Sequence, residues 1–389
     1  MNLADLPTPV LLLDRTRLER NCLRMRGRAK TLGVQLRPHL KTAKSATIAE
    51  IAHGGAKGPI TVSTLAEADY FAARGFRDIL YAVPVAPQKL AQVAAIMRRD
   101  GCDLKIITDN LDVALAIAEK GAALGVTFRV LIKIDCGLGR AGITPDSEAL
   151  LPIAAALSKP GAELAGVLTH AGHSYHARTI AEIRHIAEDE RAAVVKAAQR
   201  LREAGHPCPI VSLGSTPTAV HADSLAGVTE MRPGNYVFFD LFQVGVQSCR
   251  MEDIAVSVLA TVVSHHRGRN HLLIDAGGLA LSKDTGANEH APGTGYGLVC
   301  RPGAPLPLPG LAIHDVHQEH GLVGPLPAPE GSPAAALDFA AFPPGSRLRA
   351  LPNHSCMTGA MYDRYYVTEN LDQGDGLAVV AEWDRVNGW

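Results

Sequence analysis

Residues 104–135 read LKIITDNLDVALAIAEKGAALGVTFRVLIKID, and this stretch carries the pattern that decides the fold. Two apolar runs, Leu104–Thr108 and Phe128–Asp135, enclose the Ala-rich amphipathic segment Leu111–Ala123. Continuous apolar strands that alternate with amphipathic helices are typical of a parallel sheet covered by helices. The stretch therefore predicts one strand–helix–strand unit of an α/β protein.

The same alternation extends in both directions from this unit. Six more apolar runs are predicted strands: Val34–Arg37, Ile60–Ser63, Ile79–Val83, Leu164–Thr169, Ile210–Leu213 and Gly227–Met231. The amphipathic stretches between them are predicted helices: Thr42–Ala52, Leu65–Arg74, Pro87–Arg99 and Ile180–Glu203. Eight strands of this kind favour a closed (β/α)8 barrel over an open sheet.

The pattern changes after residue 245, where helical periodicity fades and segments dense in Gly and Pro separate short apolar runs. The predicted strands of this region are Ala255–Val263, His271–Ile274, Leu348–Leu351 and Leu377–Ala381. The region is therefore expected to be mostly β. One more predicted strand, Val10–Leu13, precedes the first helix, and its pattern fits either domain.

The composition argues against several classes of protein. The formal net charge is −1, whereas nucleic-acid binders normally carry a basic excess. No window approaches the roughly 18 uninterrupted apolar residues of a membrane span, and the first residues lack the pattern of a secretory signal. The seven cysteines are odd in number and include no CxxC pair, which predicts a reduced, cytoplasmic setting.

A lysine, Lys41, follows the first predicted barrel strand in the stretch RPHLKTAK, residues 37–44. The carboxyl ends of barrel strands form the active-site face. Partial burial there, with His39 and Arg37 as neighbouring cations, can lower the pKa of a lysine. Such a lysine suits a Schiff base, for which the amine must be deprotonated. Position alone leaves a solvated surface lysine as the alternative.

Two more strand ends predict a phosphate site. The stretch GSTPT, residues 214–218, offers a glycine for close approach, two hydroxyl groups at Ser215 and Thr216, and a proline suited to a helix start. The stretch RPGNY, residues 232–236, follows the next strand. Barrels of this class often bind phosphate between the loops after strands seven and eight. Each stretch alone could be an ordinary turn, but together they favour a phosphate-bearing ligand.

A possible metal site lies in the β-rich region, in the stretch LPNHSC, residues 351–356. Residues i and i+2 of an extended chain face the same side, so His354 and Cys356 could hold one zinc-like ion. Two protein ligands leave room for substrate, which suits a Lewis-acid site better than a structural one. A buried cysteine beside a surface histidine is the alternative that spacing alone leaves open.

Together these motifs resemble the alanine-racemase-like, or fold-type III, pyridoxal-phosphate enzymes. Within them, five stretches resemble the D-serine dehydratase group: RPHLKT, THAGHSY, GSTPT, QEHG and PNHSC. That group includes bacterial D-threo-3-hydroxyaspartate dehydratases and is related to D-threonine aldolases. The resemblance begins near the N-terminus, at LPTP of residues 6–9, and covers essentially the whole chain.

The resemblance implies the domain organisation and the site residues. It places Val10–Leu13 with the C-terminal β domain, so we expect a barrel over residues 14–244 and a β domain of residues 1–13 with 245–389. It implies Lys41 as the Schiff-base lysine, with Lys44 as a nearby charge, and Arg140 as the arginine that approaches the cofactor ring. It implies His354 and Cys356 as ligands of zinc, with manganese or cobalt as alternatives. The other expected pyridoxal 5'-phosphate contacts are His39, His170, Tyr175, Ser215, Thr216, Gly234 and Asn235.

The resemblance also implies the reaction. A dehydratase would eliminate water from D-serine, D-threonine or D-threo-3-hydroxyaspartate and yield a 2-oxo acid and ammonia. A D-threonine aldolase, giving glycine and an aldehyde, is the alternative. The aldolases tend to carry His-x-Asp where this chain has His354-x-Cys356, and this difference favours the dehydratase. A racemase and a pyridoxal-phosphate homeostasis protein fit less well, and a homodimer is expected by analogy.

Overall fold

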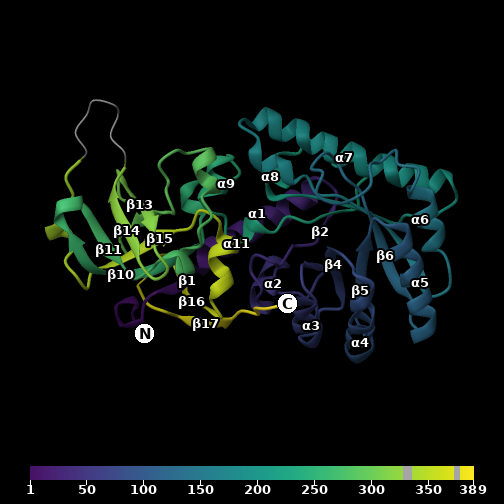
Figure 1. The fold of residues 1–389 in the computed structure, drawn as a ribbon, viewed down its shortest axis with the longest axis horizontal. Coiled ribbons are helices and arrows are strands. Elements are labelled where there is room, and N and C mark those ends of the chain that lie inside the picture. The colour runs from purple at the N-terminus through teal and green to yellow at the C-terminus, as the bar shows by residue number, and fades with distance from the viewer. Residues whose placement is uncertain (327–334, 372–376) are drawn as a thin grey trace. The chain divides into compact units, whose positions relative to one another are not determined.

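A computed structural model of the chain describes residues 1–326, 335–371 and 377–389. They divide into two units, which Figure 1 labels by element. The β unit contains Met1–Asn21 and Asn235–Arg385, and the barrel unit contains Cys22–Gly234 and Val386–Trp389.

The divisions lie at Asn21/Cys22 and Gly234/Asn235, eight residues after and ten residues before the expected limits at 13/14 and 244/245. Val386–Trp389 was expected in the β domain but lies in the barrel unit. The start of helix α1 (Arg15–Thr31) belongs to the β unit because its side chains reach carbonyl groups there. The Arg17 Nη1 atom donates to the Ile254 carbonyl at 2.9 Å, and Asn21 Nδ2 donates to the Asp253 carbonyl at 2.8 Å. These hydrogen bonds attach the start of α1 to the β unit, and the apolar pattern of the sequence gives no sign of them.

The barrel unit is built on an eight-stranded parallel sheet in the order β2-β9-β8-β7-β6-β5-β4-β3. The ring closes between the chain after β2 and strand β3, because Leu40 N donates to the Thr61 carbonyl at 2.8 Å and Thr61 N donates to the Pro38 carbonyl at 2.9 Å. The (β/α)8 prediction is confirmed, and each predicted strand overlaps an observed one. Their bounds are β2 (Gln35–Leu36), β3 (Ile60–Val62), β4 (Asp78–Pro84), β5 (Asp103–Thr108), β6 (Phe128–Lys133), β7 (Ala162–Leu168), β8 (Ile210–Leu213) and β9 (Glu230–Met231).

Capping side chains mark where several helices of the barrel unit begin. The Thr64 hydroxyl caps α3 and the Asn110 side chain caps α5, each by accepting from a backbone N–H of the first turn. Helix α6 was not predicted, because it has seven residues and no side-chain cap. The predicted helix over 42–52 begins only at Ala46. The bounds are α2 (Ala46–Ala52), α3 (Leu65–Ala73), α4 (Leu90–Asp100), α5 (Leu111–Leu124), α6 (Leu150–Ala156), α7 (Ile180–Glu203) and α8 (Thr216–His221).

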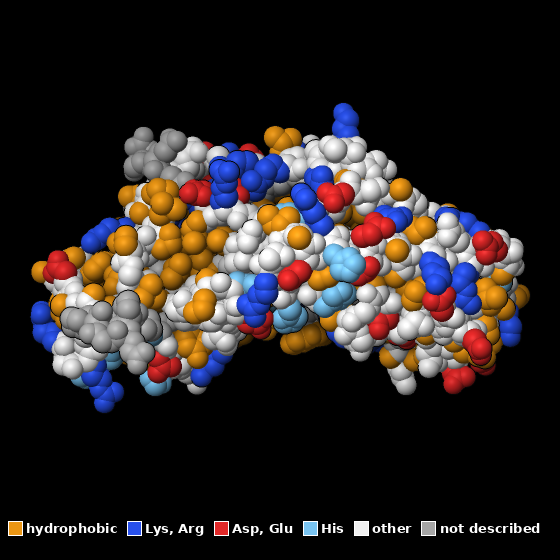
Figure 2. All heavy atoms as spheres, turned by 90° about the horizontal axis from the view of Figure 1, so that it is seen from above, with side chains coloured by type: hydrophobic (Ala, Val, Ile, Leu, Met, Phe, Trp, Pro, Cys, Tyr) orange, Lys and Arg blue, Asp and Glu red, His pale blue; other side chains and the backbone are white. Residues whose placement is uncertain are grey.

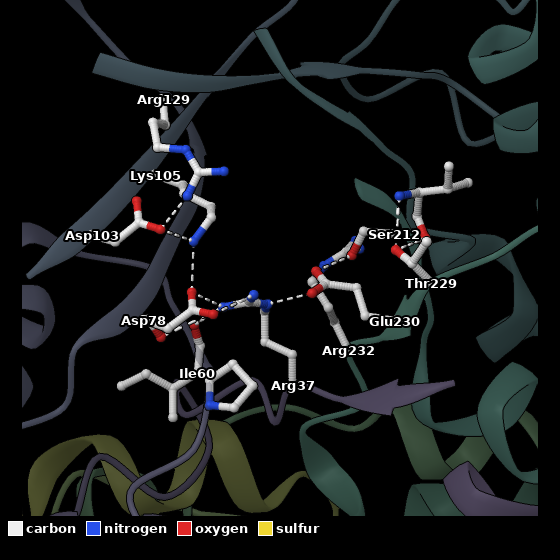
Figure 3. A network of polar contacts seen from close by, with 12 residues as sticks. Arg37, Ile60, Asp78, Asp103, Lys105, Arg129, Ser212, Thr229, Glu230 and Arg232 are labelled. Carbon is white, nitrogen blue, oxygen red and sulfur yellow. Dashed lines mark hydrogen bonds and ion pairs between the residues drawn. The ribbon is translucent and has the colours of Figure 1, made fainter. Parts of the chain in front are cut away.

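A network of charged side chains links several strands of the barrel (Figure 3). Arg37 lies between two acidic residues: its Nε is 2.8 Å from Glu230 Oε2, and its Nη1 is 2.7 Å from Asp78 Oδ1. Lys105 extends the network, with its Nζ 2.7 Å from the same Asp78 oxygen. Arg37 and Glu230 are both buried, so each compensates the charge of the other.

The β unit is a nine-stranded, mostly antiparallel sheet in the order β11-β14-β13-β12-β15-β10-β1-β16-β17, with β10 also paired to β11. Strand β1 pairs antiparallel with β10 and parallel with β16, which confirms that the first strand joins the C-terminal domain. The bounds are β1 (Val10–Asp14), β10 (Val256–His266), β11 (His271–Ile274), β12 (Leu298–Cys300), β13 (Leu311–Val316), β14 (Gly321–Pro325), β15 (Arg347–Leu351), β16 (Arg364–Thr368) and β17 (Ala381–Asp384).

One predicted strand of this unit is wrong. The last strand begins at Ala381, whereas the apolar run had placed it at Leu377–Ala381. Leu377 and Val379 instead pack against the buried cluster that contains Leu3 and Leu6. These two side chains are therefore hydrophobic because they pack in a core, not because they lie in a strand. The sequence did not predict strands β12, β13, β14 and β16.

The surface agrees with the near-neutral composition. Figure 2 shows basic and acidic side chains interspersed over the visible face, without one large field of a single sign. Within the described ranges, no helix has both the length and the apolar character that crossing a membrane requires.

Candidate active site

Lys41 lies in a tight connection between β2 and α2, and it is exposed. Backbone hydrogen bonds hold this connection: His39 N donates to the Pro233 carbonyl, in the loop after β9, at 2.9 Å, and Lys44 N donates to the Leu40 carbonyl within the connection at 2.7 Å. Lys44 has a positive φ of 50°, and its Nζ lies 3.2 Å from the buried Glu67. Lys44 is thus engaged in an ion pair, and the side chain of Lys41 is directed to solvent.

Gly234 explains how the loop after β9 approaches Lys41. A Cβ atom at this position would lie 2.6 Å from the His39 carbonyl oxygen, which no ordinary side chain allows. Glycine therefore lets the Arg232–Gly234 backbone pack directly against the residues before Lys41.

The histidines beside Lys41 are neutral at ordinary pH. Burial lowers the pKa of His39 well below its usual range, and the charges of Lys41, Arg232, His170 and Arg140 lower it further. Burial and the charge of Lys41 have the same effect on the pKa of His170. His39 was expected to act as a cation near Lys41, and this is wrong. Arg37 was the other expected cation, but it points to Glu230 and Asp78 (Figure 3).

Further cations lie near these histidines. Burial lowers the pKa of Lys133, at the end of β6, to about 8, and the charge of Arg232 adds to this effect. Arg140 is exposed in the loop after β6, and its charge acts on His39, His170 and Lys133. The mouth of the barrel thus gathers positive charge, as a site for a phosphate-bearing, carboxylate-bearing ligand requires.

The loop after β8 forms a cradle at the start of α8. Ser215 caps this helix by accepting from Thr218 N, and Pro217 lies in its first turn. Gly214 has a φ of 125°, and a Cβ atom there would lie 3.0 Å from the Arg232 backbone nitrogen. The Thr216 hydroxyl is buried and meets no hydrogen-bond partner among the described residues. This hydroxyl is therefore available to a ligand, whereas the Ser215 hydroxyl is already bonded within the loops.

Asn235 follows Gly234 in the chain and begins a second cluster, in the β unit. Its Nδ2 lies 2.7 Å from Asp240 Oδ2, 3.0 Å from Ser355 Oγ and 3.9 Å from Cys356 Sγ. The same Asp240 oxygen accepts from Ser355 N at 2.9 Å. Asp240 thus ties the segment after the cradle to the segment that carries His354 and Cys356.

His354 is held by a carboxylate. Its Nδ1 lies 2.7 Å from Asp284 Oδ2, and Gly286 N in turn holds the other Asp284 oxygen at 2.8 Å. Burial disfavours the charged imidazole, but the hydrogen bonds from Asp284 and Cys356 and the charge of Asp240 together raise the pKa of His354 to about 11. Of residues 354–356, His354 alone has an extended backbone, because helix α11 (Ser355–Thr358) begins immediately after it. The two side chains meet across a helix start, which corrects the extended-strand argument.

The residues present fit both groups that the resemblance implies. An exposed Lys41, a buried hydroxyl without a partner at Thr216 and close backbone approach at Gly214 and Gly234 suit pyridoxal phosphate. An imidazole and a thiol suit a borderline metal ion. No cluster of three or more His, Cys, Asp or Glu side chains able to hold a metal occurs in the described part of the chain. His354 and Cys356 are the two side chains that the resemblance offers to such an ion.

The predicted residues fall into two groups. Lys41, His39, Arg140, His170, Tyr175, Ser215, Thr216 and Gly234 lie in the barrel unit, and Asn235, His354 and Cys356 lie together in the β unit. Tyr175 is half-buried in a short 3-10 helix, η3 (Gly172–His176). Sequence reasoning missed Glu190, Asp240 and Asp284. Of these three, only Glu190 could have been found from the sequence, because its position falls on the apolar face of α7 with Ile183, Ala187 and Val194.

Comparison with known proteins identifies the family. The family model "Alanine racemase, N-terminal domain" matches residues 13–241, and "Putative serine dehydratase domain" matches residues 255–368. A D-threo-3-hydroxyaspartate dehydratase of Delftia sp. (strain HT23) is 45% identical, over 100% of this chain and 99% of that protein. The chain belongs to the D-serine dehydratase group of alanine-racemase-like enzymes.

Further relatives show which members of the group this dehydratase-group protein resembles more. A D-serine dehydratase of Dictyostelium discoideum is 34% identical over 95% of both chains, and a D-threonine aldolase of Arthrobacter sp. is 30% identical over 95% of this chain and 90% of that one. The solved structure of the Delftia enzyme matches with a TM-score of 0.94 and 44% identity, covering 100% of both chains. The chain is accordingly a carbon–oxygen lyase, and it is more similar in sequence to these two dehydratases than to the aldolase.

Proposed function

We propose that this chain is a pyridoxal-phosphate- and divalent-metal-dependent dehydratase of D-3-hydroxy amino acids, which yields a 2-oxo acid and ammonia. The proposal rests on His354 and Cys356. The imidazole of His354 is held in place by a hydrogen bond of 2.7 Å to the Asp284 carboxylate. Dehydration needs help for a departing hydroxide, and this pair offers donors for a Lewis acid.

The barrel unit supplies the cofactor residues. Lys41 would carry the cofactor, the buried Thr216 hydroxyl would donate a hydrogen bond to its phosphate, and Gly214 and Gly234 would allow the backbone to approach it. His39, Arg140, His170, Tyr175 and Ser215 are the further cofactor contacts proposed in this unit, and Asn235, the first residue of the β unit after Gly234, is one more. When bound, pyridoxal phosphate delocalises the charge that remains after an α-proton departs. Lys41 is the general base that takes and holds this proton on its Nζ.

The β unit supplies the metal ligands. His354 would bind the ion through Nε2, because Asp284 occupies Nδ1, and Cys356 would bind it through Sγ. The ion would supply Lewis-acid help to the leaving hydroxide. Mixed nitrogen and sulfur donors favour zinc, with manganese and cobalt as alternatives. Two solved variants of a D-threo-3-hydroxyaspartate dehydratase replace a histidine and a cysteine two positions apart with alanine, and the cysteine variant is described as metal-free.

The substrate is a D-amino acid with a 3-hydroxyl group. D-threo-3-hydroxyaspartate is the first candidate, because the 45% identity to its dehydratase exceeds the 34% identity to the D-serine dehydratase. D-Serine and D-threonine are the others. The cations at the barrel mouth, including Arg140, suit a substrate that carries carboxylate charge.

A product assay tests this function. The purified enzyme, loaded with pyridoxal phosphate and zinc, is incubated with each of the three D-amino acids and with the matching L-amino acids. We expect 2-oxo acid and ammonia from the D-forms only, and loss of both products after chelation. Glycine with an aldehyde would indicate an aldolase, and a metal-independent reaction would contradict the proposed role of His354 and Cys356.

We also propose that the enzyme is a homodimer, as is usual for this fold. Sedimentation at assay concentrations tests this, and a fully active monomer in dilute solution would contradict it. The cytoplasmic setting expected from the cysteine pattern stays a prediction.

A further inference from the structure

Glu190 is a fully buried carboxylate in the middle of helix α7, where its helix neighbours Ile183, Ala187 and Val194 are apolar. A charge at such a position is costly, and an apolar side chain would serve the packing of this helix better. The contacts that explain a glutamate at this position should therefore lie outside α7.

The carboxylate of Glu190 holds two active-site loops at once. Its Oε1 accepts from Ala171 N, after β7, at 2.7 Å and from Gly214 N, after β8, at 3.1 Å. Its Oε2 accepts from the Thr218 hydroxyl, in the first turn of α8, at 2.8 Å. One side chain thus fixes the spacing between the His170 loop and the cradle.

Hydroxyl groups close these contacts into a ring. The Thr218 and Ser215 hydroxyls lie 3.0 Å apart, the Ser215 and Ser174 hydroxyls lie 2.8 Å apart, and Ser174 donates to the Ala171 carbonyl at 2.7 Å. The ring returns to Glu190 through the Ala171 backbone. Every hydroxyl in it is engaged, whereas the adjacent Thr216 hydroxyl lies outside it and meets no partner in the parts of the chain that are described.

The contacts also connect the cradle to His170. The Nδ1 atom of His170 lies 3.0 Å from the Gly214 carbonyl oxygen, while the N–H of the same glycine is held by Glu190. Gly214 is therefore fixed on both sides. The positive charges of Lys133 and Arg232 interact with Glu190 and compensate the burial of its carboxylate.

We propose that Glu190 is a positioning residue that preorganises the cradle of residues 214–218 for the phosphate of the cofactor. This inference rests on the proposed function, because it takes the ligand of the cradle to be pyridoxal phosphate. Glu190 does not touch the ligand. It holds Gly214 and Thr218 so that the Thr216 hydroxyl and the first turn of α8 face the phosphate without reorganisation.

The test compares pyridoxal phosphate with pyridoxal, which lacks the phosphate group. Dissociation constants for both are measured by absorbance on the apo-enzyme, for wild type and Glu190→Gln. Glutamine keeps one oxygen for the two backbone N–H groups but removes the charged acceptor of Thr218. We expect the affinity for pyridoxal phosphate to fall about tenfold, as for loss of one charge-assisted hydrogen bond. The affinity for pyridoxal should not change.

Matched variants separate this role from general damage. Thr218→Val removes the same hydrogen bond without charge change, together with the hydroxyl that accepts from Ser215 N, and should give the same selective loss. Thr218→Ser keeps both contacts and should restore binding. The double variant Glu190→Gln with Thr218→Val should lose no more than either single one. Glu188→Gln, on an exposed position of the same helix, should leave both affinities unchanged.

Two outcomes would overturn the inference. Equal losses for pyridoxal and pyridoxal phosphate would show that Glu190 only stabilises the fold, and unchanged affinities in both Glu190→Gln and Thr218→Val would show that the ring does not shape the cradle. If Glu190→Gln does not fold, the Thr218 pair decides by the same criterion. A wild type that binds neither compound would instead overturn the proposed function, and the inference with it.

Discussion

The Oδ2 atom of Asp284 lies 2.7 Å from Nδ1 of His354, and this contact selects the ring nitrogen that remains for a ligand. Asp284 is itself fixed by Gly286 N, and its own carbonyl accepts from Asn353 Nδ2 at 3.0 Å. The residue before His354 and the carboxylate that orients it are thus joined. A histidine held in this way presents one defined nitrogen to a metal ion.

Asp284→Asn should lower the affinity of the protein for zinc by roughly 10- to 100-fold, because loss of the carboxylate frees the ring and weakens its basicity. Competition with a chromophoric chelator measures this affinity. Asp363→Asn, at an exposed ion pair of the same unit, is the control and should bind zinc as wild type does. Equal affinities of all three proteins would show that Asp284 does not support a metal-binding His354.

Borohydride reduction of the loaded enzyme, followed by peptide mapping, should place the pyridoxyl group on Lys41. The reason is that Lys41 is directed to solvent at the barrel mouth, whereas Lys44 is paired with Glu67 at 3.2 Å. Lys41→Ala should abolish the adduct and Lys44→Ala should retain it. An adduct on Lys44 would contradict the assignment.

His354→Ala and Cys356→Ala should bind pyridoxal phosphate as wild type does but lose turnover by orders of magnitude. Several kcal/mol of help to the leaving hydroxide is lost, and each ~1.4 kcal/mol is tenfold in rate. Absorbance titration and 2-oxo acid assays measure the two effects. Chelation of the wild type should have the same result, and zinc, manganese or cobalt should reverse it. Normal turnover and metal content in Cys356→Ala would mean that the pair is structural.

Stability should fall as the pH drops below about 6.5, the ordinary pKa of histidine. His39 and His170 have strongly lowered pKa values in the folded protein, chiefly because of burial. Below that pH the two histidines bind protons in the unfolded chain but not in the folded protein. Their contribution to the free energy of unfolding is therefore complete above about pH 6.5 and is lost below it. Urea unfolding across this range measures the slope. His170→Asn should flatten it, whereas His185→Asn, at an exposed position, should not.

Arg37→Met should lower the free energy of unfolding by about 3–5 kcal/mol, because it leaves the buried carboxylate of Glu230 without its partner. Denaturant unfolding measures this loss. Arg99→Met removes exposed ion pairs and should leave the unfolding midpoint nearly unchanged. A small effect of Arg37→Met would mean that Glu230 is compensated by Arg232 or by water.

The barrel could be predicted from sequence because its strands are largely buried on both faces, so runs such as Phe128–Asp135 are mostly apolar. The β unit was harder, since short strands such as β12 (Leu298–Cys300) lie among Gly and Pro, and Leu377 is apolar without being in a strand. Motifs located Lys41, Thr216 and His354. The supporting carboxylates could not be located in this way, because an acidic side chain is normally solvated and only the packing around Glu190 shows otherwise.

Strand β1 gives the chain an unusual order of assembly. Val10 pairs with Leu259, and Leu12 pairs with Tyr366. The first strand therefore cannot form its sheet until the last third of the chain has been synthesised. The barrel strands between them are complete by then and can fold first. Until β10 emerges, β1 is an unpaired apolar edge, the kind of segment that chaperones cover and that aggregates when left exposed. Expression of the C-terminal half alone should therefore give an unstable β unit, and the two ends of the chain should become protected from hydrogen exchange together.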